Sequence, residues 1–303
     1  MNANARGSRT SGKRASGKRE RGSRARVLSI AGTDPSGGAG LMADLRTMAA
    51  LGAYGMGVVT NAVAQNTQGV RAVLAVPSSS VRAQLEAVSD DVTIDGVKIG
   101  MLGGVETIET VRAWLEAFGS RRPPVVLDPV MISTSGTRLL DEDAVFALHK
   151  LLCSGLIDVV TPNIPELAAL CEWAVPKDWE GVRELAIEFA GESGAKVYAK
   201  SGHLESSDDR TDALVSWDQA KSEARIDEFA GTLVETQNTH GTGCTLSSAL
   251  ATFAAQGSGW VKAARRAKSF MNGAIAHADE LHVGHGHGPI DQLWNTTYDV
   301  GNE

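Results

Sequence analysis

Long hydrophobic runs are missing from this sequence of 303 residues. No apolar run reaches the roughly 18 residues that a membrane-spanning helix requires. The first residues also lack the apolar segment of a secretory signal. We therefore expect a cytoplasmic protein that has no membrane partner.

Cysteine is scarce as well, with three residues in the chain. Cys153, Cys171 and Cys244 lie far apart and form no C-x-x-C pair. An odd number of cysteines at such spacing excludes a disulfide framework and is typical of a reducing compartment.

Aromatic residues make up only 5% of the chain, whereas 33 residues are glycine. This balance suits a domain with many tight turns between strands and helices. Hydrophobic residues reach 43%, which is enough for a sizeable core. The length fits one large α/β domain or two small ones.

Acidic residues are nearly absent from residues 1–26, which hold nine lysines and arginines against one glutamate. This segment carries a net charge of +8, and the remainder carries −15, which together give the total of −7. Because residues 1–26 have almost no apolar side chains, we expect a disordered basic tail. The acidic remainder argues against a nucleic-acid-binding surface on the folded part.

From Val27 onward, short apolar runs alternate with helical patterns. The runs that predict strands are 27–31, 57–65, 69–77, 95–102, 124–131, 157–163 and 195–202, with a β-meander over 210–235. The stretches that predict helices are 41–51, 79–88, 105–118, 141–152, 180–191, 242–255 and 259–280. Buried-looking strands that alternate with helices imply a mostly parallel sheet covered on both faces. We assign residues 27–295 to a single domain and 296–303 to a short tail.

Polar and glycine-rich segments follow several of these apolar runs. In parallel α/β folds, ligands bind beyond the carboxyl ends of the strands. We therefore expect the following residues to converge at one edge of the sheet: Gly32 to Gly40, Gln65, Met101, Asp128, Asn163 to Glu166, Lys200 and Gly241 to Cys244.

The segment "HGTGCT" contains Gly241, Thr242 and Gly243 in front of a predicted helix. Two glycines let the backbone approach a charged group, and the start of a helix presents free N–H groups and a positive dipole end. The pattern predicts an anion hole for phosphoryl oxygens. An ordinary tight turn into a helix is the alternative.

Cys244 has four interpretations. A metal ligand would need partners at ligand spacing, and His240 alone does not make a site. A covalent nucleophile would need a positioned base, and a small buried residue would need nothing else. We favour a proton acceptor, because a thiol at a helix N-terminus has a lowered pKa and titrates near neutrality.

Asp128 and Glu166 supply carboxylates that suit Mg²⁺ beside a triphosphate. For Glu166, and for Asp44 in "ADLRT", the alternative is a first-turn acid that complements the helix dipole. The amide of Gln65 can pair with an amino-and-ring-nitrogen edge, as glutamine does with adenine, or it can be a solvated strand end. His285 and His287 are interpreted as plain loop residues.

Eight segments occur in an order that resembles the hydroxymethylpyrimidine/phosphomethylpyrimidine kinase family of thiamine biosynthesis. They are "AGTDPSGGAGLMADLRTMAALGAYG", "AVAQNTQGV", "KIGML", "VVLDPVM", "TPNIPE", "KSGH", "NTHGTGCT" and "VGHGHGP". The resemblance covers about Val27 to Trp294. It implies a ribokinase-like three-layer α/β/α fold with a central mostly parallel sheet, the use of ATP and Mg²⁺, a homodimer, and two successive phosphorylations of a pyrimidine alcohol.

The resemblance also implies roles for individual residues. The aminopyrimidine would contact Gln65, in a pocket that Asp44 shares and that Gly32, Val63 and Met101 line. Asn163 and Glu166 would serve the Mg²⁺–phosphate region with Asp128, and Lys200 and Thr242 would contact phosphate. Gly241 to Gly243 would form the anion hole, and Cys244 would be the catalytic base. The sequence departs from the family at Thr134, where a lysine is frequent, and at Ser201, where a glycine is frequent.

Three rival functions are weighed. A pyridoxal kinase shares the fold and the thiol, but pyridoxal has no aminopyrimidine edge for Gln65. A non-catalytic sensor would have lost Cys244, Asp128 or Glu166, and all three are present. A covalent thiol enzyme would form an adduct on Cys244 during turnover.

Overall fold

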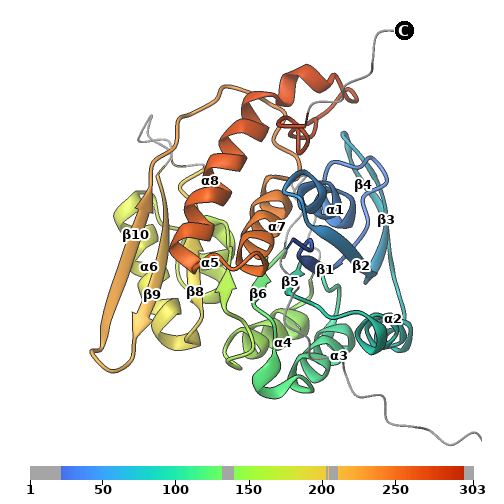
Figure 1. Ribbon diagram of the computed structural model, residues 1–303. Helices are drawn as coiled ribbons and strands as arrows, with labels where there is room; N and C mark the ends of the chain where they lie inside the picture. Colours follow the sequence, from blue (N-terminus) through green and yellow to red (C-terminus); the bar gives the residue numbers. More distant parts are fainter. Residues whose placement is uncertain (1–21, 132–139, 203, 205–210, 297–303) are drawn as a thin grey trace, which may run out of the picture.

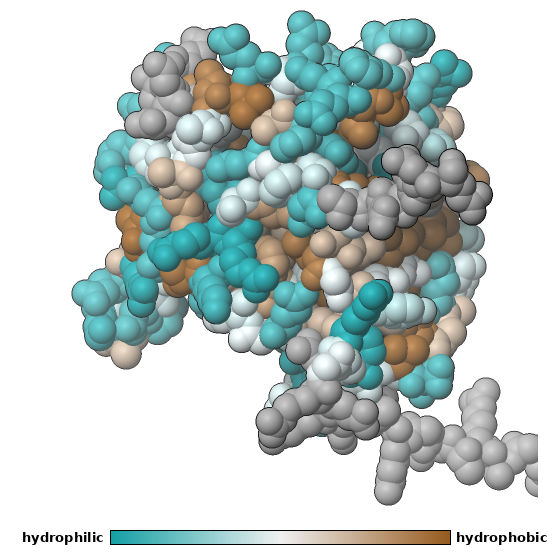
Figure 2. Space-filling view, turned by 45° about the horizontal axis from the view of Figure 1, so that its top comes forward, coloured by the Kyte–Doolittle hydropathy of each residue, from teal (hydrophilic) through white to brown (hydrophobic). Residues whose placement is uncertain are grey.

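The computed structural model describes residues 22–131, 140–202, 204 and 211–296 (Figure 1). Most of the expected basic tail, the departure at Thr134 and residues 297–303 lie outside the described residues. Among the described residues, none of the helices combines the length and the apolar character that a membrane span requires. Figure 2 shows apolar side chains in separate patches among hydrophilic ones on the face that it presents.

An eight-stranded sheet forms the middle layer, in the order β10-β9-β8-β7-β6-β5-β1-β2. The parallel strands are β1 (Arg26–Ala31), β2 (Tyr54–Val59), β5 (Gly96–Ile99), β6 (Val125–Leu127), β7 (Val159–Val160) and β8 (Lys196–Ala199). An antiparallel hairpin of β9 (Asp212–Asp218) and β10 (Glu223–Phe229) extends the sheet beyond β8. The predicted mostly parallel sheet is therefore confirmed.

Helices cover both faces of this sheet (Figure 1). One face packs against α2 (Ser78–Asp91), α3 (Val105–Glu116), α4 (Glu142–Leu152), α5 (Ile164–Leu170) and α6 (Trp179–Ser193). The other face packs against α1 (Gly40–Ala50), α7 (Thr242–Ala255) and α8 (Trp260–Ala276). Two short 3-10 turns, η1 (Gly119–Arg121) and η2 (Ala278–Leu281), complete the elements.

Alternation along the strands creates the two faces. In β6, Val125 and Leu127 belong to the core beneath α2–α6, whereas Val126 belongs to the core beneath α1, α7 and α8. Successive side chains of a strand point to opposite faces, so a fully apolar strand fills both cores. The three-layer α/β/α architecture follows from this pattern and is confirmed.

The sequence predicted a single strand over the apolar run 57–65, but the structure divides this run between two strands. β2 ends at Val59, whose N–H donates to Gln84 Oε1 from α2 and whose carbonyl accepts from Gln84 Nε2. The chain then leaves the sheet, and β3 (Asn61–Asn66) pairs with β4 (Gly69–Ala75) in a separate two-stranded sheet. Apolar content is the same on both sides of this break, so the sequence pattern alone does not reveal it.

A charged pair lies in the middle of the α7 side of the sheet. Lys98 of β5 and Asp44 of α1 are both completely buried, and Lys98 Nζ lies 2.8 Å from each carboxylate oxygen of Asp44. Ser29 of β1 and Ser248 of α7 also donate hydrogen bonds to this carboxylate. The pair thus connects two strands and two helices that are far apart in sequence.

The electrostatic surroundings keep Lys98 charged. Burial lowers the pKa of Lys98, but the nearby Asp44, Cys244 and Asp128 outweigh burial and raise it above its ordinary value. A buried pair of this kind adds little net stability relative to apolar residues. One charge that stays buried after its partner is removed is strongly unfavourable.

We expect Lys98→Met to lower the free energy of unfolding by about 3–5 kcal/mol, because it leaves Asp44 buried without its cation. The double variant Lys98→Met/Asp44→Leu should lose less than the two single losses added together. Urea denaturation measures both effects. As a control, Lys221→Met removes an exposed lysine and should change stability by less than about 1 kcal/mol. A similarly small loss for Lys98→Met would contradict the role of the pair.

Candidate active site

The segments that follow β1, β5, β6, β7 and β8 meet at one edge of the sheet, because these strands are parallel. They bring Gly32, Met101, Asp128, Asn163 and Lys200 to this edge. The start of α7 joins them, since a Cβ on Gly243 would lie 3.0 Å from Asp128 Oδ2. The predicted convergence of the glycine-rich turn with an acidic strand end is confirmed.

The turn at Gly241 has a conformation that only glycine accepts. Its φ is +85°, and a Cβ at this position would lie 1.9 Å from the carbonyl oxygen of Gly38. The turn therefore sits directly on the segment that follows β1. In the described part of the chain, the N–H groups of Gly243 and Cys244 have no acceptor. These two donors at the N-terminus of α7 are free to bind an anion.

Asp34 and His240 hold the two glycine-rich segments together, and the sequence analysis did not single out this pair. His240 Nε2 lies 2.8 Å from Asp34 Oδ2, and the Asp34 side chain is completely buried. Burial raises the pKa of Asp34, but hydrogen bonds with His240, Ser36 and Ala39 outweigh burial and lower it to about 2. Both residues lie inside the quoted motifs, but nothing in their spacing indicates that they pair.

Cys244 is half-buried, and the structure reverses the expected direction of its pKa. Burial raises the pKa of the thiol to about 12, and the carboxylates of Asp44 and Asp128 add to this effect. The positive charge of Lys98 and a backbone hydrogen bond from Gly40 lower the pKa, but they are weaker. The sequence prediction considered the helix N-terminus alone, and it was wrong because the nearby acids and the burial dominate. Cys244 is therefore a neutral thiol in the free protein.

Small and apolar groups pack around Gly32. A Cβ on Gly32 would lie 3.4 Å from Met101 Cε and 3.5 Å from Asn61 Cβ. Val63 is buried and donates its N–H to Thr33 Oγ1. Three residues that the family resemblance assigned to the pyrimidine pocket therefore lie near one another, together with Asn61.

Asn61 was not singled out from the sequence. The residue is only 2% exposed, and its Oδ1 has no hydrogen-bond partner among the described residues. Gly103 leaves the room for this amide, because a Cβ there would lie 2.6 Å from Asn61 Oδ1. A buried acceptor without a partner is unfavourable, so its presence beside Gly32 and Met101 needs an explanation.

The sequence predicted Gln65 at the end of a strand of the main sheet. The structure instead places it on the separate β3–β4 hairpin. It is half-buried, and the strand register shifts between Ala64 and Gln65. Such an irregularity turns a side chain out of the regular alternation. The hairpin turn is fixed by Thr67 Oγ1, which accepts hydrogen bonds from the N–H groups of His285 and Gly286. His285 and His287 are accordingly loop residues.

Asp128 and Glu166 are buried neighbours at the ends of β6 and β7. Thr161 Oγ1 donates to Asp128, and the Glu166 carboxylate accepts from the N–H of Asn163. Asn163 Oδ1 accepts in turn from the N–H of Glu166, so these two residues form the capping box of α5. Burial and Asp128 raise the pKa of Glu166 to about 7, against the opposing charge of Lys200. Two neighbouring buried carboxylates are the arrangement that a cation stabilises.

Asp44 lies beneath this edge, where Lys98, Ser29 and Ser248 occupy its carboxylate. A direct contact between Asp44 and a substrate stays a prediction. Thr242 also uses its hydroxyl internally, because Oγ1 donates to the carbonyl of Thr239. Its contact with phosphate likewise stays a prediction.

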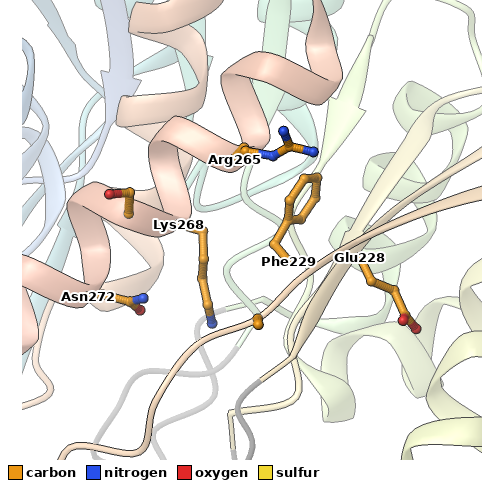
Figure 3. A pocket seen from close by; sticks show the side chains of 7 residues that line it. Glu228, Phe229, Arg265, Lys268 and Asn272 are labelled. Atoms are coloured by element: carbon orange, nitrogen blue, oxygen red, sulfur yellow. The ribbon is translucent and has the colours of Figure 1, made fainter.

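A cavity of about 380 Å³ opens between α8 and the end of β10 (Figure 3). Phe229, Arg265, Lys268, Ser269 and Asn272 are among the residues that line it. Lys268 Nζ lies 2.8 Å from Asp212 Oδ2, and Asp212 Oδ1 accepts from the N–H of Ser201, next to Lys200. Because Lys200 lies close enough to Glu166 to lower its pKa, the cavity opens at the same edge as the two carboxylates.

Comparisons with known proteins show the family to which the chain belongs. Residues 34–291 match the family described as phosphomethylpyrimidine kinase. The hydroxymethylpyrimidine/phosphomethylpyrimidine kinase of Escherichia coli is 42% identical over 263 residues, which cover 87% of this chain and 95% of that protein. The thiamine biosynthesis multifunctional protein ThiED of Corynebacterium glutamicum is 47% identical over 266 residues, which cover 88% of this chain and 34% of that protein. The chain thus spans about a third of the length of such multifunctional relatives.

Solved structures show the same fold. A phosphomethylpyrimidine kinase from Clostridium difficile has a TM-score of 0.69 at 35% identity and covers 83% of this chain and 100% of its own. A pyridoxal kinase from Staphylococcus aureus in complex with ADP has a TM-score of 0.79 at 28% identity and covers 91% of this chain and 96% of its own. Fold and site together define a phosphotransferase of the ribokinase-like class. Within that class, the chain belongs to the phosphomethylpyrimidine kinase family.

The raised pKa of Glu166 predicts a pH-dependent stability of the metal-free protein. The pKa of Glu166 is about 7 in the folded protein and near its ordinary value of 4.5 in the unfolded chain. Stability should therefore fall as the pH rises from about 4.5 to 7, by up to about 3 kcal/mol. Glu166→Gln keeps a capping-box residue but removes the charge, so it should stabilise the protein more at pH 8 than at pH 5.

Urea denaturation at both pH values, with a chelator present, measures this difference. Glu184→Gln changes an exposed glutamate of α6 and serves as the control. An equal effect of Glu166→Gln at pH 5 and pH 8 would show that Glu166 does not titrate as described.

Proposed function

We propose that the protein transfers the γ-phosphoryl group of ATP to 4-amino-5-hydroxymethyl-2-methylpyrimidine and then to the resulting monophosphate. The names of the relatives support this substrate. The observation that carries the proposal is the seating of the Gly241–Cys244 turn against both Asp128 and the segment that follows β1. This seating supports a role for the N–H groups of Gly243 and Cys244 as anion-binding donors next to Asp128 and close to the proposed pyrimidine site.

The carboxylates of Asp128 and Glu166 would hold Mg²⁺. Their mutual proximity and burial fit a divalent cation, because its charge would offset the repulsion that raises the pKa of Glu166. The ion would neutralise charge on the phosphate oxygens of ATP. Lys200 would supply further positive charge at the same place, and Asn163 would fix the orientation of Glu166 through the capping box.

Phosphoryl transfer needs positioning and charge stabilisation more than covalent chemistry. The N–H groups of Gly243 and Cys244 would bind the transferring oxygens, and loss of one such donor typically costs about 3 kcal/mol of barrier. Because Gly241 rests on Gly38, the Asp34–His240 pair would hold these donors in register with the pyrimidine pocket.

The Cys244 thiol would lie against the acceptor hydroxyl. Its backbone contact with Gly40 places it at the base of the segment that starts with Gly32, between the pocket and the donors. Since the free thiol is neutral, Cys244 accepts a proton only if the cations of the complete complex lower its pKa. The second acceptor, a phosphate monoester, is already largely ionised at pH 7 and needs no base.

We expect Cys244→Ala to slow phosphorylation of the alcohol much more than phosphorylation of the monophosphate. Cys244→Asp, which places a low-pKa base at the same position, should restore part of the first step. Single-turnover rates for each acceptor give the comparison, with Cys171→Ala as the control thiol. Equal losses of rate in both steps would contradict the assignment of Cys244 as the base.

The pyrimidine would occupy the space beside Gly32 and Met101. Its exocyclic amino group is a hydrogen-bond donor, and Asn61 Oδ1 is a buried acceptor that has no partner in the described part of the chain. The Gln65 amide would pair with the remaining polar edge of the ring. A contact with substrate would thus remove the desolvation penalty that Asn61 carries in the free protein.

The base of ATP would occupy the cavity between α8 and β10. A volume of about 380 Å³ accommodates a purine, and the amide of Asn272 and the hydroxyl of Ser269 supply polar partners. From this cavity, the phosphates would extend past Lys268 and Lys200 toward Asp128 and Glu166.

If the pyrimidine and ATP bind at these two places, a substitution at either one should change the KM of one substrate and not of the other. Asn61→Ala should raise the KM for the pyrimidine alcohol about tenfold, the effect of one lost hydrogen bond, and should leave the KM for ATP unchanged. Asn272→Ala should raise the KM for ATP and leave the KM for the pyrimidine unchanged. Steady-state kinetics measure both.

A purely structural role of Asn61 would give a different result. Because Oδ1 has no partner, Asn61→Ala should not destabilise the ligand-free protein in urea denaturation. A destabilised Asn61→Ala variant with an unchanged KM would contradict the proposed contact.

A pyridoxal kinase is the second candidate, favoured by the similarity to pyridoxal kinase structures. The partnerless acceptor of Asn61 favours the pyrimidine.

We further propose a cytoplasmic homodimer. Tyr54 of β2 and Val73 and Leu74 of β4 are exposed apolar residues that a second copy would cover.

A further inference from the structure

A second cluster of reactive side chains lies at the ends of α4 and α6. His149 and Cys153 are one turn apart at the end of α4, and Glu192 is in the last turn of α6. One ring nitrogen of His149, the Sγ of Cys153 and one carboxylate oxygen of Glu192 all lie within 4.8 Å of one another.

The cluster is remote from the candidate active site. Both helices return the chain to the beginning of the next parallel strand, α4 to β7 and α6 to β8. Their last turns therefore lie at the amino-end edge of the sheet, whereas the candidate active site lies at the carboxyl-end edge. None of the roles proposed above involves these three residues.

The distances between the candidate ligand atoms are close to those between neighbouring ligand atoms of a metal site. His149 Nε2 lies 3.1 Å from Glu192 Oε1, and His149 Nδ1 lies 3.8 Å from Cys153 Sγ. Bonds of about 2.0–2.3 Å in a tetrahedral site place neighbouring ligand atoms at similar separations. A single ion takes one ring nitrogen, so a rotation of the exposed Cys153 side chain would complete the set.

The surroundings favour a cation at this position. α4 and α6 both direct their C-terminal, negatively polarised ends at the cluster, where a thiolate and a carboxylate are otherwise unfavourable. The completely buried ring of Phe189 packs in an edge-to-face arrangement with the ring of His149. The two ring centroids are 5.9 Å apart, and this contact limits the movement of His149. The imidazole is thus held in place, while the two exposed ligands can adjust.

We propose that His149, Cys153 and Glu192 bind a divalent cation of the zinc class, with water in the fourth position. A thiolate together with an imidazole selects Zn²⁺ or Co²⁺ over Mg²⁺ and Ca²⁺. Binding forms the metal–sulfur bond and releases the thiol proton to solvent, and no oxidation occurs. The ion would link the ends of α4 and α6, so it would stabilise the folded chain.

Titration of the purified full chain with Co²⁺ tests this proposal, because a cobalt–thiolate bond has a characteristic near-ultraviolet charge-transfer band. We expect one equivalent to produce the band and Zn²⁺ to displace it. Cys153→Ser should abolish the band, and His149→Gln or Glu192→Gln should weaken binding more than about tenfold. Cys171→Ser and Glu188→Gln, which change a neighbouring thiol and an exposed acid of α6, should leave the band unchanged.

Thermal denaturation with and without Zn²⁺ gives a second measurement. The increase in Tm that Zn²⁺ causes in the unaltered chain should be absent in Cys153→Ser, whose metal-free Tm should match that of the unaltered chain. A charge-transfer band that persists in Cys153→Ser, or the absence of the band in the unaltered chain, would overturn the proposal.

Discussion

The buried ion pair of Lys98 and Asp44 is the interaction on which the candidate active site depends. It lies directly beneath the edge where Asp128 and Cys244 meet, and it connects β5 to α1, with Ser248 adding α7. Lys98 is also the cation that most lowers the pKa of Cys244. The pair therefore connects the elements that carry the site, and the charge of Lys98 acts on its thiol, which an apolar residue of equal volume could not do.

Two segments separated by about two hundred residues make up the rest of the site's framework. The segment after β1 and the turn before α7 are joined by the Asp34–His240 contact and by the seating of Gly241 on Gly38. This explains why glycine is needed at both places: a Cβ on Gly241 would meet the Gly38 carbonyl, and a Cβ on Gly38 would meet the side chains of His240 and Pro289. The proposed pyrimidine pocket would use one segment and the proposed anion hole the other, so their contact would set the distance between acceptor and phosphate.

The sequence predicted the layers of the fold and the edge of the site, because apolar alternation and strand ends are local patterns. It did not predict that the chain leaves the sheet at Thr60, since the apolar run continues into β3. It also gave the pKa of Cys244 the wrong sign, because the acids and the burial that raise it come from other elements. Asn61 and the Asp34–His240 pair likewise depend on contacts between distant segments, which no spacing along the chain reveals.

In the proposed function, this site distinguishes an aminopyrimidine alcohol from pyridoxal. The most direct measurement is an ATP-dependent phosphorylation assay on both compounds with the purified protein, in which both products of the pyrimidine are followed. We expect a higher kcat/KM for the pyrimidine alcohol and the successive appearance of its monophosphate and diphosphate. A higher kcat/KM for pyridoxal, or a pyrimidine reaction that stops at the monophosphate, would contradict it.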